Sequence, residues 1–143
     1  MFMGEYSHNI DEKGRLIMPS KFREELGSEF VVTPGIDGCL YAYPMDEWKN
    51  TVESIREAVS TGKDARTFRR RLLSQAEKIT IDKQGRFSLP PAQKEKAGLK
   101  KEVVFAGVLN KIEIWDKDAW DDIIDDGDME ELADKMAELG ISI

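Results

Sequence analysis

The chain has 143 residues, of which 41% are hydrophobic and 34% are charged, and its formal net charge is −7. This balance is typical of a soluble globular protein with one or two small cores, and no run approaches the roughly 18 apolar residues of a membrane span. The N-terminal stretch lacks a basic segment followed by an apolar one, so we expect no secretory signal. Cys39 is the only cysteine, which excludes an intramolecular disulfide, argues against a cysteine-based zinc site and fits a reducing cytoplasm.

The acidity of the chain is concentrated at its C-terminal end. Residues 113–143 carry 12 acidic and 2 basic side chains, a net charge of −10. Residues 1–112 carry 16 acidic and 19 basic side chains, a net charge of +3. Because the basic residues of this body gather at two short turns, the overall charge does not exclude a nucleic-acid partner.

The first predicted element is a strand over 5–10, followed by the turn Asp11-Glu12-Lys13-Gly14-Arg15. An Asp at the first position of a turn can bond the backbone two residues on, and a Gly at the fourth position adopts the left-handed conformation easily. Residues 15–18 predict a return strand that ends at Pro19. The pattern therefore predicts a β-hairpin with a basic turn.

A short helix, two strands and a long helix are predicted next. Ser20 is the expected N-cap of the short helix, and Gly27 is its expected end. Two β-rich runs, 30–33 and 39–43, predict strands separated by a turn. The long helix is predicted over 45–59, where apolar residues recur at spacings of four, three and four. These residues are Trp48, Val52, Ile55 and Val59.

Residues 60–64 interrupt this periodicity and predict a linker, and a second helix is predicted over 65–76. That helix contains the basic run Arg69-Arg70-Arg71. Such a run is compatible with a solvated face, with a contact to acidic residues of a neighbouring subunit, or with a contact to DNA phosphates. The sequence leaves these three alternatives open.

From residue 78 the same order of elements begins again. The second turn, Asp82-Lys83-Gln84-Gly85-Arg86, repeats the Asp-x-x-Gly-Arg pattern of the first. In the later strands, 103–107 matches 31–35, so we expect a one-residue insertion between the turn and these strands. This pattern indicates an internal duplication. We expect a first repeat with its helix over 1–60, a linker helix over 61–76, and a second repeat with acidic C-terminal helices over 77–143.

Two further helices are predicted in the acidic C-terminal segment. Trp120, Ile123 and Ile124 form one short apolar face, and a second face repeats at spacings of three, four and three. Its members are Met129, Leu132, Met136 and Leu139. The acidic residues of these helices would form a solubilising surface, or would compete with DNA for the basic turns.

The arginine that ends each turn is not explained by turn geometry. Arg15 and Arg86 occur in both copies although the neighbouring residues differ. A structural interpretation is that each Arg pairs with the Asp four residues earlier and stiffens the loop. A functional interpretation is that the guanidinium contacts phosphate or the guanine edge, because a two-stranded β-ribbon can enter the major groove of DNA. The candidate DNA-binding residues are Arg15, Arg86, Asp11, Asp82, Lys13, Lys83, Lys21 and Arg23.

Enzymatic function is not indicated by any motif. A pair of catalytic aspartates of the aspartic-protease type would be followed by Thr/Ser-Gly, whereas Glu12 and Lys83 follow here. His8 is the only histidine and is expected to be a hydrogen-bonded structural residue. No glycine-rich phosphate loop or nucleophile motif is present. We therefore expect no enzyme activity, no cofactor, no metal site and no small-molecule substrate.

Three stretches resemble the MraZ family. They are residues 3–23, with the first turn, Pro19 and Arg23; residues 70–76, Arg-Arg-Leu-Leu-Ser-Gln-Ala; and the second turn with Pro90. The resemblance covers residues 1–140. It implies an α+β fold in which two tandem SpoVT-AbrB-type swapped-hairpin repeats form a small β-barrel flanked by helices.

The resemblance also implies a function. MraZ-type proteins are bacterial transcription regulators that form ring-shaped homo-oligomers and repress the division and cell-wall gene cluster, including their own gene. Their DNA contacts are ascribed to turns that correspond here to Asp11 with Arg15 and to Asp82 with Arg86. We therefore expect a cytoplasmic, nucleoid-associated repressor that binds short direct repeats in promoter DNA, with no membrane partner. The alternative is an AbrB-like antitoxin or an oligomeric protein-binding scaffold.

Overall fold

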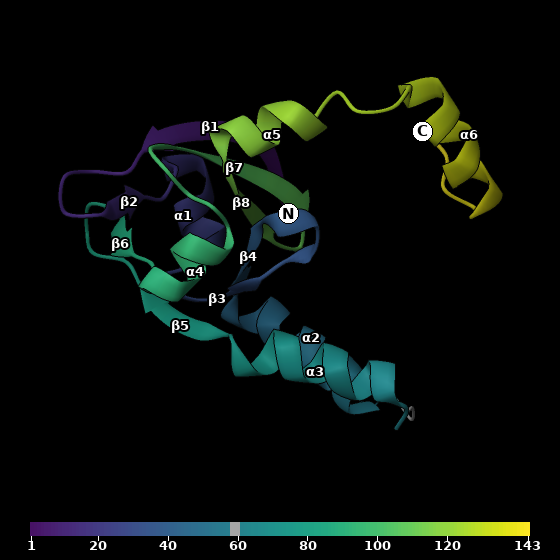
Figure 1. The fold of residues 1–143 in the computed structure, drawn as a ribbon, viewed down its shortest axis with the longest axis horizontal. Helices are drawn as coiled ribbons and strands as arrows, with labels where there is room; N and C mark the ends of the chain where they lie inside the picture. Colours follow the sequence, from purple (N-terminus) through teal and green to yellow (C-terminus); the bar gives the residue numbers. More distant parts are fainter. Residues whose placement is uncertain (58–60) are drawn as a thin grey trace.

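Strands from the two repeats are interleaved within one sheet (Figure 1). The computed structural model describes residues 1–57 and 61–143. The first repeat contains β1 (Phe2–Asn9), β2 (Arg15–Ile17), α1 (Ser20–Leu26), β3 (Glu29–Pro34), the 3-10 turn η1 (Ile36–Gly38), β4 (Leu40–Pro44) and α2 (Met45–Glu57). The helix α3 (Lys63–Ser74) follows, and the second repeat contains β5 (Glu77–Thr80), β6 (Arg86–Ser88), α4 (Pro91–Lys96), β7 (Glu102–Leu109), β8 (Ile112–Asp116), α5 (Lys117–Ile123) and α6 (Met129–Glu138).

The main sheet has the antiparallel order β1-β7-β8-β4-β3-β5, and β2 and β6 form a separate two-stranded ribbon. The first strand of each repeat pairs with the third strand of the other repeat, as β1 does with β7 and β5 with β3. This exchange of strands between the repeats, together with the helices, confirms the α+β class and the swapped arrangement of two repeats. The described strands form an open sheet and a ribbon, not one closed ring of hydrogen bonds.

A pseudo-two-fold axis relates the repeats. The register pairs Leu16 with Phe87 in the ribbon and Tyr41 with Glu113 between β4 and β8, and both pairs join equivalent positions. The expected match of 31–35 with 103–107 is wrong by one position, because the registers of β3 and β7 make Glu29 equivalent to Glu102. The connection before β7 is longer than its counterpart before β3, and the connection before β4 is longer than its counterpart before β8. The insertions therefore lie in loops of both repeats.

The hairpin predicted around the first turn is also wrong. β1 pairs with β7, whereas β2 pairs with β6, so the turn connects strands of different sheets. The physical reason is that a two-stranded hairpin is marginally stable by itself, so the burial of an apolar face decides the pairing. Pairing with the other repeat places Leu16 against Phe87, and both side chains are buried.

Both repeats contribute to the larger hydrophobic core. Alternate residues of β7 point to opposite faces of the sheet, as the period of a strand requires. Val103 and Phe105 belong to the larger core, whereas Val104 and Ala106 belong to a smaller cluster. The smaller cluster also contains Cys39, Trp115 and Trp120. Both tryptophans are buried.

The helices agree with the predictions in type and differ at their ends. Pro19, not Ser20, is the N-cap of α1, and its side chain makes no capping hydrogen bond because proline has no polar side-chain atom. Gly27 ends α1 in the left-handed region, as predicted. Lys63 and Asp64, predicted in the linker, are the first residues of α3. Val59, predicted at the end of the long helix, and Ser60, predicted at the start of the linker, lie outside the described residues.

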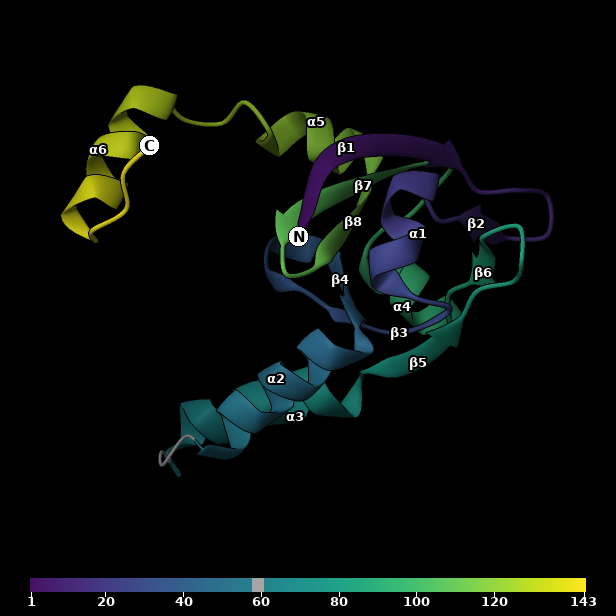
Figure 2. The same cartoon turned by 180° about the vertical axis from the view of Figure 1, so that it is seen from behind.

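Two helical projections extend from the sheet. Figure 2 shows α2 and α3 on one side of it, and α6 beyond α5, away from the rest of the molecule. The predicted break between the two C-terminal helices is confirmed, since α5 and α6 are separate. Within the part of the chain that the structure describes, no helix is both long and apolar enough to cross a membrane.

Candidate nucleic-acid interface

One aspartate, Asp11, organises the first turn. Its Oδ1 atom accepts hydrogen bonds from the backbone N–H groups of Lys13, at 2.9 Å, and Arg15, at 2.7 Å. Its Oδ2 atom accepts a hydrogen bond from Nε of Arg15 at 2.8 Å. Gly14 has φ 76° and donates its N–H to the carbonyl of Asp11 at 2.9 Å. The carboxylate therefore fixes the turn and the arginine together.

The second turn repeats this arrangement with one difference. Asp82 accepts from the backbone N–H groups of Gln84 and Arg86, both at 2.9 Å, and from Nε of Arg86 at 2.7 Å. Gln84 stands where the first turn has Lys13, and its Oε1 accepts from Nη2 of Arg86 at 2.6 Å. Arg86 is therefore held at two of its nitrogens, whereas Arg15 is held at one.

Hydrogen bonding shifts the titration of both aspartates. The backbone N–H of Arg15 is the largest of the causes that lower the pKa of Asp11, and the guanidinium of Arg15 acts in the same direction. The backbone N–H and the guanidinium of Arg86 lower the pKa of Asp82 in the same way. Both carboxylates are therefore ionised at neutral pH and available to hold the arginines.

The two arginines lie on one face of one ribbon. Arg15 pairs with Ser88, and Ile17 pairs with Arg86, so the arginines occupy diagonal positions. Such positions lie roughly 7–8 Å apart in an antiparallel pair. Leu16 and Phe87 point to the opposite face and are buried in the core. The packing of that inner face therefore directs both arginines outward, with side-chain exposures of 30% and 35%.

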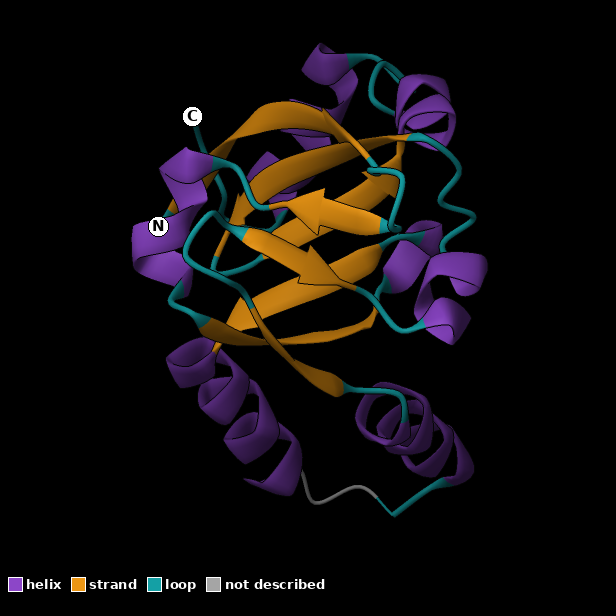
Figure 3. Ribbon diagram, turned by 90° about the vertical axis from the view of Figure 1, so that its left-hand side faces the viewer, coloured by secondary structure: helices purple, strands orange, loops and turns teal. Residues whose placement is uncertain are grey.

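Both turns reach the same end of the molecule. They form its left-hand edge in Figure 1, and Figure 3 looks onto that edge. A shallow hollow of about 480 Å³ lies beside the ribbon, and its lining includes Arg15, Asp82 and Arg86. Although the arginines come from turns that are far apart in the sequence, they thus form one surface.

The remaining candidates fall into two groups. Lys13, Lys83 and Lys21 are exposed, the first two in the turns and the third on α1. Arg23 instead donates from Nε to the carbonyl of Met18 at 2.8 Å and packs under the second turn. A Cβ atom added to residue 85 would lie 2.3 Å from Cζ of Arg23.

Each short helix thus supports the turn of the other repeat. Arg23 of α1 lies against Gly85, and Lys94 of α4 lies near Gly14, where an added Cβ would be 3.1 Å from its Nζ atom. The equivalence of Arg23 and Lys94 is visible in the sequence, since each follows the aspartate of its own turn at the same distance along the chain. The crossing of each helix to the other turn was missed, because nothing in the local sequence indicates strand exchange.

The remaining residues with catalytic or metal-binding chemistry, Cys39 and His8, pack against other side chains in the described part of the chain. Among these residues, no three or more His, Cys, Asp or Glu side chains are placed to hold a metal ion. Burial raises the pKa of the Cys39 thiol to about 12, which makes it an unreactive core residue. The ring of His8 packs edge-on against Phe105, with centroids 6.3 Å apart. The structure thus gives the His8 ring an aromatic contact in place of the side-chain hydrogen bond that we expected.

The exchanged strands and the paired turns define an α+β protein of two interleaved repeats. The model of the family described as "MraZ protein, putative antitoxin-like" matches residues 1–71 and again 72–139. The chain belongs to this family.

Relatives match over their whole length. The chain is 50% identical to the transcriptional regulator MraZ of Lachnoclostridium phytofermentans over 142 residues, which are 99% of each protein. It is 49% identical to the transcriptional regulator MraZ of Clostridium tetani, over 99% of this chain and all of that protein. The MraZ regulator of Clostridium beijerinckii is 46% identical over the same shares. These names describe regulators and agree with the prediction that the chain is not an enzyme.

Proposed function

We propose that the chain is a DNA-binding transcriptional regulator. The observation that carries this proposal is the position of Arg15 and Arg86 on one outward face of the ribbon, each with Nε held by an aspartate. The relatives named as transcriptional regulators support it. A surface with fixed guanidinium groups is suited to reading base edges, because the orientation of each fork is set before binding.

The ribbon would enter the major groove of double-stranded DNA. With Nε occupied, the Nη atoms of Arg15 remain for O6 and N7 of guanine, a contact worth about 1–3 kcal/mol of discrimination. Lys13 and Lys83 at the turns would contact phosphates, which position the protein without reading sequence. Lys21 would extend the phosphate contacts along α1, whereas Arg23 would act indirectly by supporting the second turn.

Affinity would come from assembly. Two arginine contacts per chain give weak binding, and a homo-oligomer that presents several ribbons to short direct repeats raises the effective concentration of each. We propose a ring-like oligomer on promoter DNA at the nucleoid, and repression of the division and cell-wall cluster including the gene of this chain. This finer assignment rests on what the resemblance to the family implies.

A mobility-shift titration on the DNA upstream of the chain's own gene tests the proposal. We expect a shift that a scrambled DNA of equal length and composition does not give at the same protein concentration. Affinity should fall steeply between about 50 and 200 mM salt, since released counterions dominate phosphate binding. Equal binding to both DNAs would contradict sequence recognition, and a flat salt response would contradict phosphate contact.

The family description includes the word antitoxin, which makes an AbrB-like antitoxin or scaffold the second candidate. Antitoxins of this kind commonly hold their toxin with a disordered C-terminal segment. Here residues 129–138 form the helix α6, which favours the DNA-binding proposal. A chain that fails to shift its own upstream DNA even at low salt would favour the second candidate.

A further inference from the structure

The helix α6 leaves its apolar face exposed. Met129 is 68% exposed and Leu132 is 41% exposed, and Met136 and Leu139 on the same face are also exposed. Figures 1 and 2 both show α6 held away from the sheet, beyond the end of α5. Ile141 and Ile143, which follow the helix, line a small hollow together with Met129, Leu132 and Met136. They leave these side chains exposed, as an apolar face does when no larger surface covers it.

The other side of α6 is acidic. Its sequence carries four acidic residues and one basic residue, a net charge of −3. The acidic residues are Glu130, Glu131, Asp134 and Glu138, and the basic residue is Lys135. A partner for this helix therefore needs an apolar floor and a basic rim.

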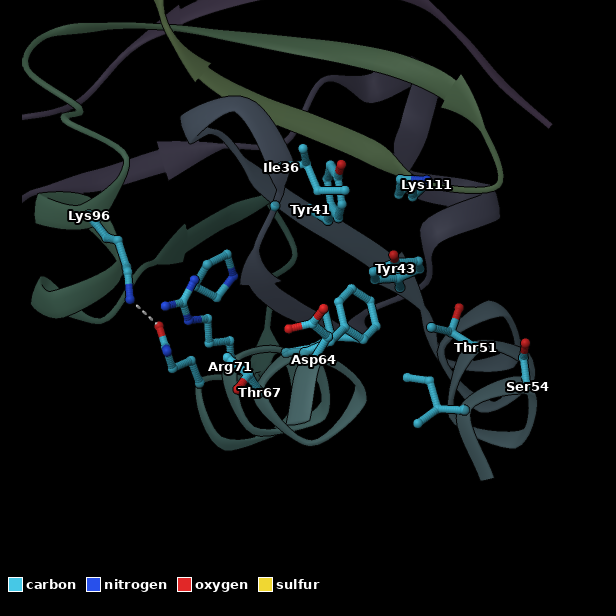
Figure 4. A pocket seen from close by; sticks show the side chains of 16 residues that line it. Ile36, Tyr41, Tyr43, Thr51, Ser54, Asp64, Thr67, Arg71, Lys96 and Lys111 are labelled. Atoms are coloured by element: carbon cyan, nitrogen blue, oxygen red, sulfur yellow. Dashed lines mark hydrogen bonds between the residues drawn. The ribbon is translucent and has the colours of Figure 1, made fainter. Parts of the chain in front are cut away.

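The groove between α2 and α3 has both properties. It has a volume of about 1070 Å³, and apolar side chains from β4, α2 and α3 are among those that line it. Tyr43 (Figure 4) comes from β4, Ile55 from α2 and Phe68 from α3. Phe68 is 53% exposed.

The charged residues of the groove are mainly basic. Its lining contains Arg71, Lys96 and Lys111 against one acid, Asp64 (Figure 4). The ammonium of Lys111 lies over the ring of Tyr41, at 4.9 Å from its centroid. None of the ion pairs formed within residues 1–57 and 61–143 engages Arg71, Lys96 or Lys111 with a carboxylate. These three cations can therefore pair with acidic groups from outside the chain.

We propose that α6 of one copy docks into the groove between α2 and α3 of a second copy. The apolar face formed by residues 129, 132, 136 and 139 would cover Ile55, Phe68 and Tyr43, and the acidic side would face the basic rim. A ten-residue helix is about 15 Å long, and this mode of binding is that of an amphipathic helix in a hydrophobic groove.

The partner is a second copy because the two complementary surfaces belong to one chain and do not meet within it. Such a contact is heterologous, so each copy donates one helix and receives another, and the series closes into a ring or continues as a filament. The inference deepens the proposed assembly and rests on it, but it requires no DNA contact. Of the three alternatives for the basic run of α3, it assigns to Arg71 the contact with acidic residues of a neighbouring subunit.

Cysteine cross-linking between separately purified chains tests the contact. One chain carries Phe68→Cys and the other carries Leu132→Cys, and the native Cys39 is buried and stays unreactive. After subunit exchange and mild oxidation, we expect a disulfide-linked dimer in the mixture. The control replaces the first chain with Met3→Cys, which is on the edge strand β1 and 67% exposed. This control should give no dimer.

Two results would overturn the proposal. One is the absence of the dimer at concentrations where the wild-type chain is assembled. The other is a monomer with an intrachain disulfide in the double variant of Phe68→Cys and Leu132→Cys, which would show that α6 folds back on its own groove.

A second measurement compares Leu132→Asp with Glu131→Asp, which places the same side chain one position away on the acidic side. We expect Leu132→Asp to lower the mass found by sedimentation velocity to that of a smaller species, while Glu131→Asp retains the wild-type mass. Both should retain the circular dichroism of the folded body, since α6 lies away from it. An unchanged mass for Leu132→Asp would overturn the docking proposal.

Deletion of residues 125–143 separates this proposal from the proposed function. If α6 builds the assembly, the deletion lowers the number of subunits per particle and weakens binding to the upstream DNA. If the acidic tail competes with DNA for the turns, the deletion strengthens binding with the number of subunits unchanged, and the docking proposal fails. A wild-type chain that assembles through α6 but does not shift the upstream DNA would contradict the proposed function alone.

Discussion

Two hydrogen bonds from Nε atoms to aspartates give Arg15 and Arg86 fixed orientations on the ribbon. We expect Arg15→Ala and Arg86→Ala each to weaken binding to the upstream DNA by roughly five- to 150-fold, because a good bidentate contact with guanine contributes about 1–3 kcal/mol. Fluorescence anisotropy with labelled DNA measures the change. Arg15→Lys is the matched control, since it keeps the charge but loses the planar fork.

The Arg15→Lys variant should bind nearly as weakly as Arg15→Ala if the fork reads bases, and nearly as strongly as the wild type if only charge matters. Sedimentation velocity should show an unchanged assembly for all three variants. An alanine variant that binds as tightly as the wild type would make its arginine a structural part of the turn.

The two turn aspartates make the stability of the folded state depend on pH in the acidic range. The pKa of Asp11 lies below its ordinary value of 3.8, and the same holds for Asp82. Each therefore stabilises the folded state above about pH 3.8, and this contribution is lost as the pH falls through the lower, folded-state pKa. Carboxyl carbon shifts followed by NMR should give midpoints below 3.8 for both residues.

Asp11→Asn provides the comparison, because its side-chain oxygen can still accept the backbone hydrogen bonds but carries no charge. Its stability to urea should change less between pH 5 and pH 3 than that of the wild type. A midpoint at or above 3.8 for Asp11 would contradict the hydrogen-bond geometry of the turn.

Among the elements, the short helix α1 and the second turn depend on each other. Gly85 has φ 81°, and an added Cβ would contact the guanidinium of Arg23. Gly85→Ala should cost about 1–2 kcal/mol for the left-handed conformation. It should cost about 1 kcal/mol more because Arg23 must leave the carbonyl of Met18. Gly98→Ala is the control, with φ 62° and nothing near its added Cβ.

Urea unfolding of these variants measures the difference, and a double-mutant cycle with Arg23→Ala isolates the contact. The extra cost of Gly85→Ala should disappear in the Arg23→Ala background. Equal costs for Gly85→Ala and Gly98→Ala in the wild-type background would contradict the packing of Arg23 on the turn.

The elements also show which features the sequence could predict. The Asp-x-x-Gly-Arg turns follow from local chemistry, and both form as expected. The long helices follow from their apolar period, and α3 begins and ends two residues before its predicted bounds. Strand partners could not be predicted from the residues alone, because β1 and β7 are far apart in sequence and strand propensity does not specify a partner.

The residues of the candidate DNA-binding surface could be predicted from the sequence, but their arrangement could not. Each arginine stands out as a residue that the turn does not need, but only the register of β2 with β6 brings Arg15 and Arg86 to one face. The role of Arg23 under Gly85 was missed for the same reason, since it depends on a contact between repeats.

At the scale of the molecule, neither repeat is expected to fold as a monomer. Separate fragments 1–60 and 61–143 would lose every pairing between β1 and β7, β3 and β5, β4 and β8, and β2 and β6. We expect each fragment alone to be unfolded or to self-associate, and the mixture to regain the circular dichroism and cooperative unfolding of the intact chain. A fragment that is folded and monomeric by sedimentation would contradict this expectation.

The pseudo-two-fold axis has a consequence for direction on DNA. A dimer of identical single repeats is bound to be symmetric, and would read the same sequence in either sense along the double helix. In this chain the copies are covalently joined and differ, so that Gln84 stands in the place of Lys13 and one arginine has an additional hydrogen bond. The ribbon therefore has a head and a tail, and only a reader with such polarity can place successive copies in the same sense on directly repeated sites.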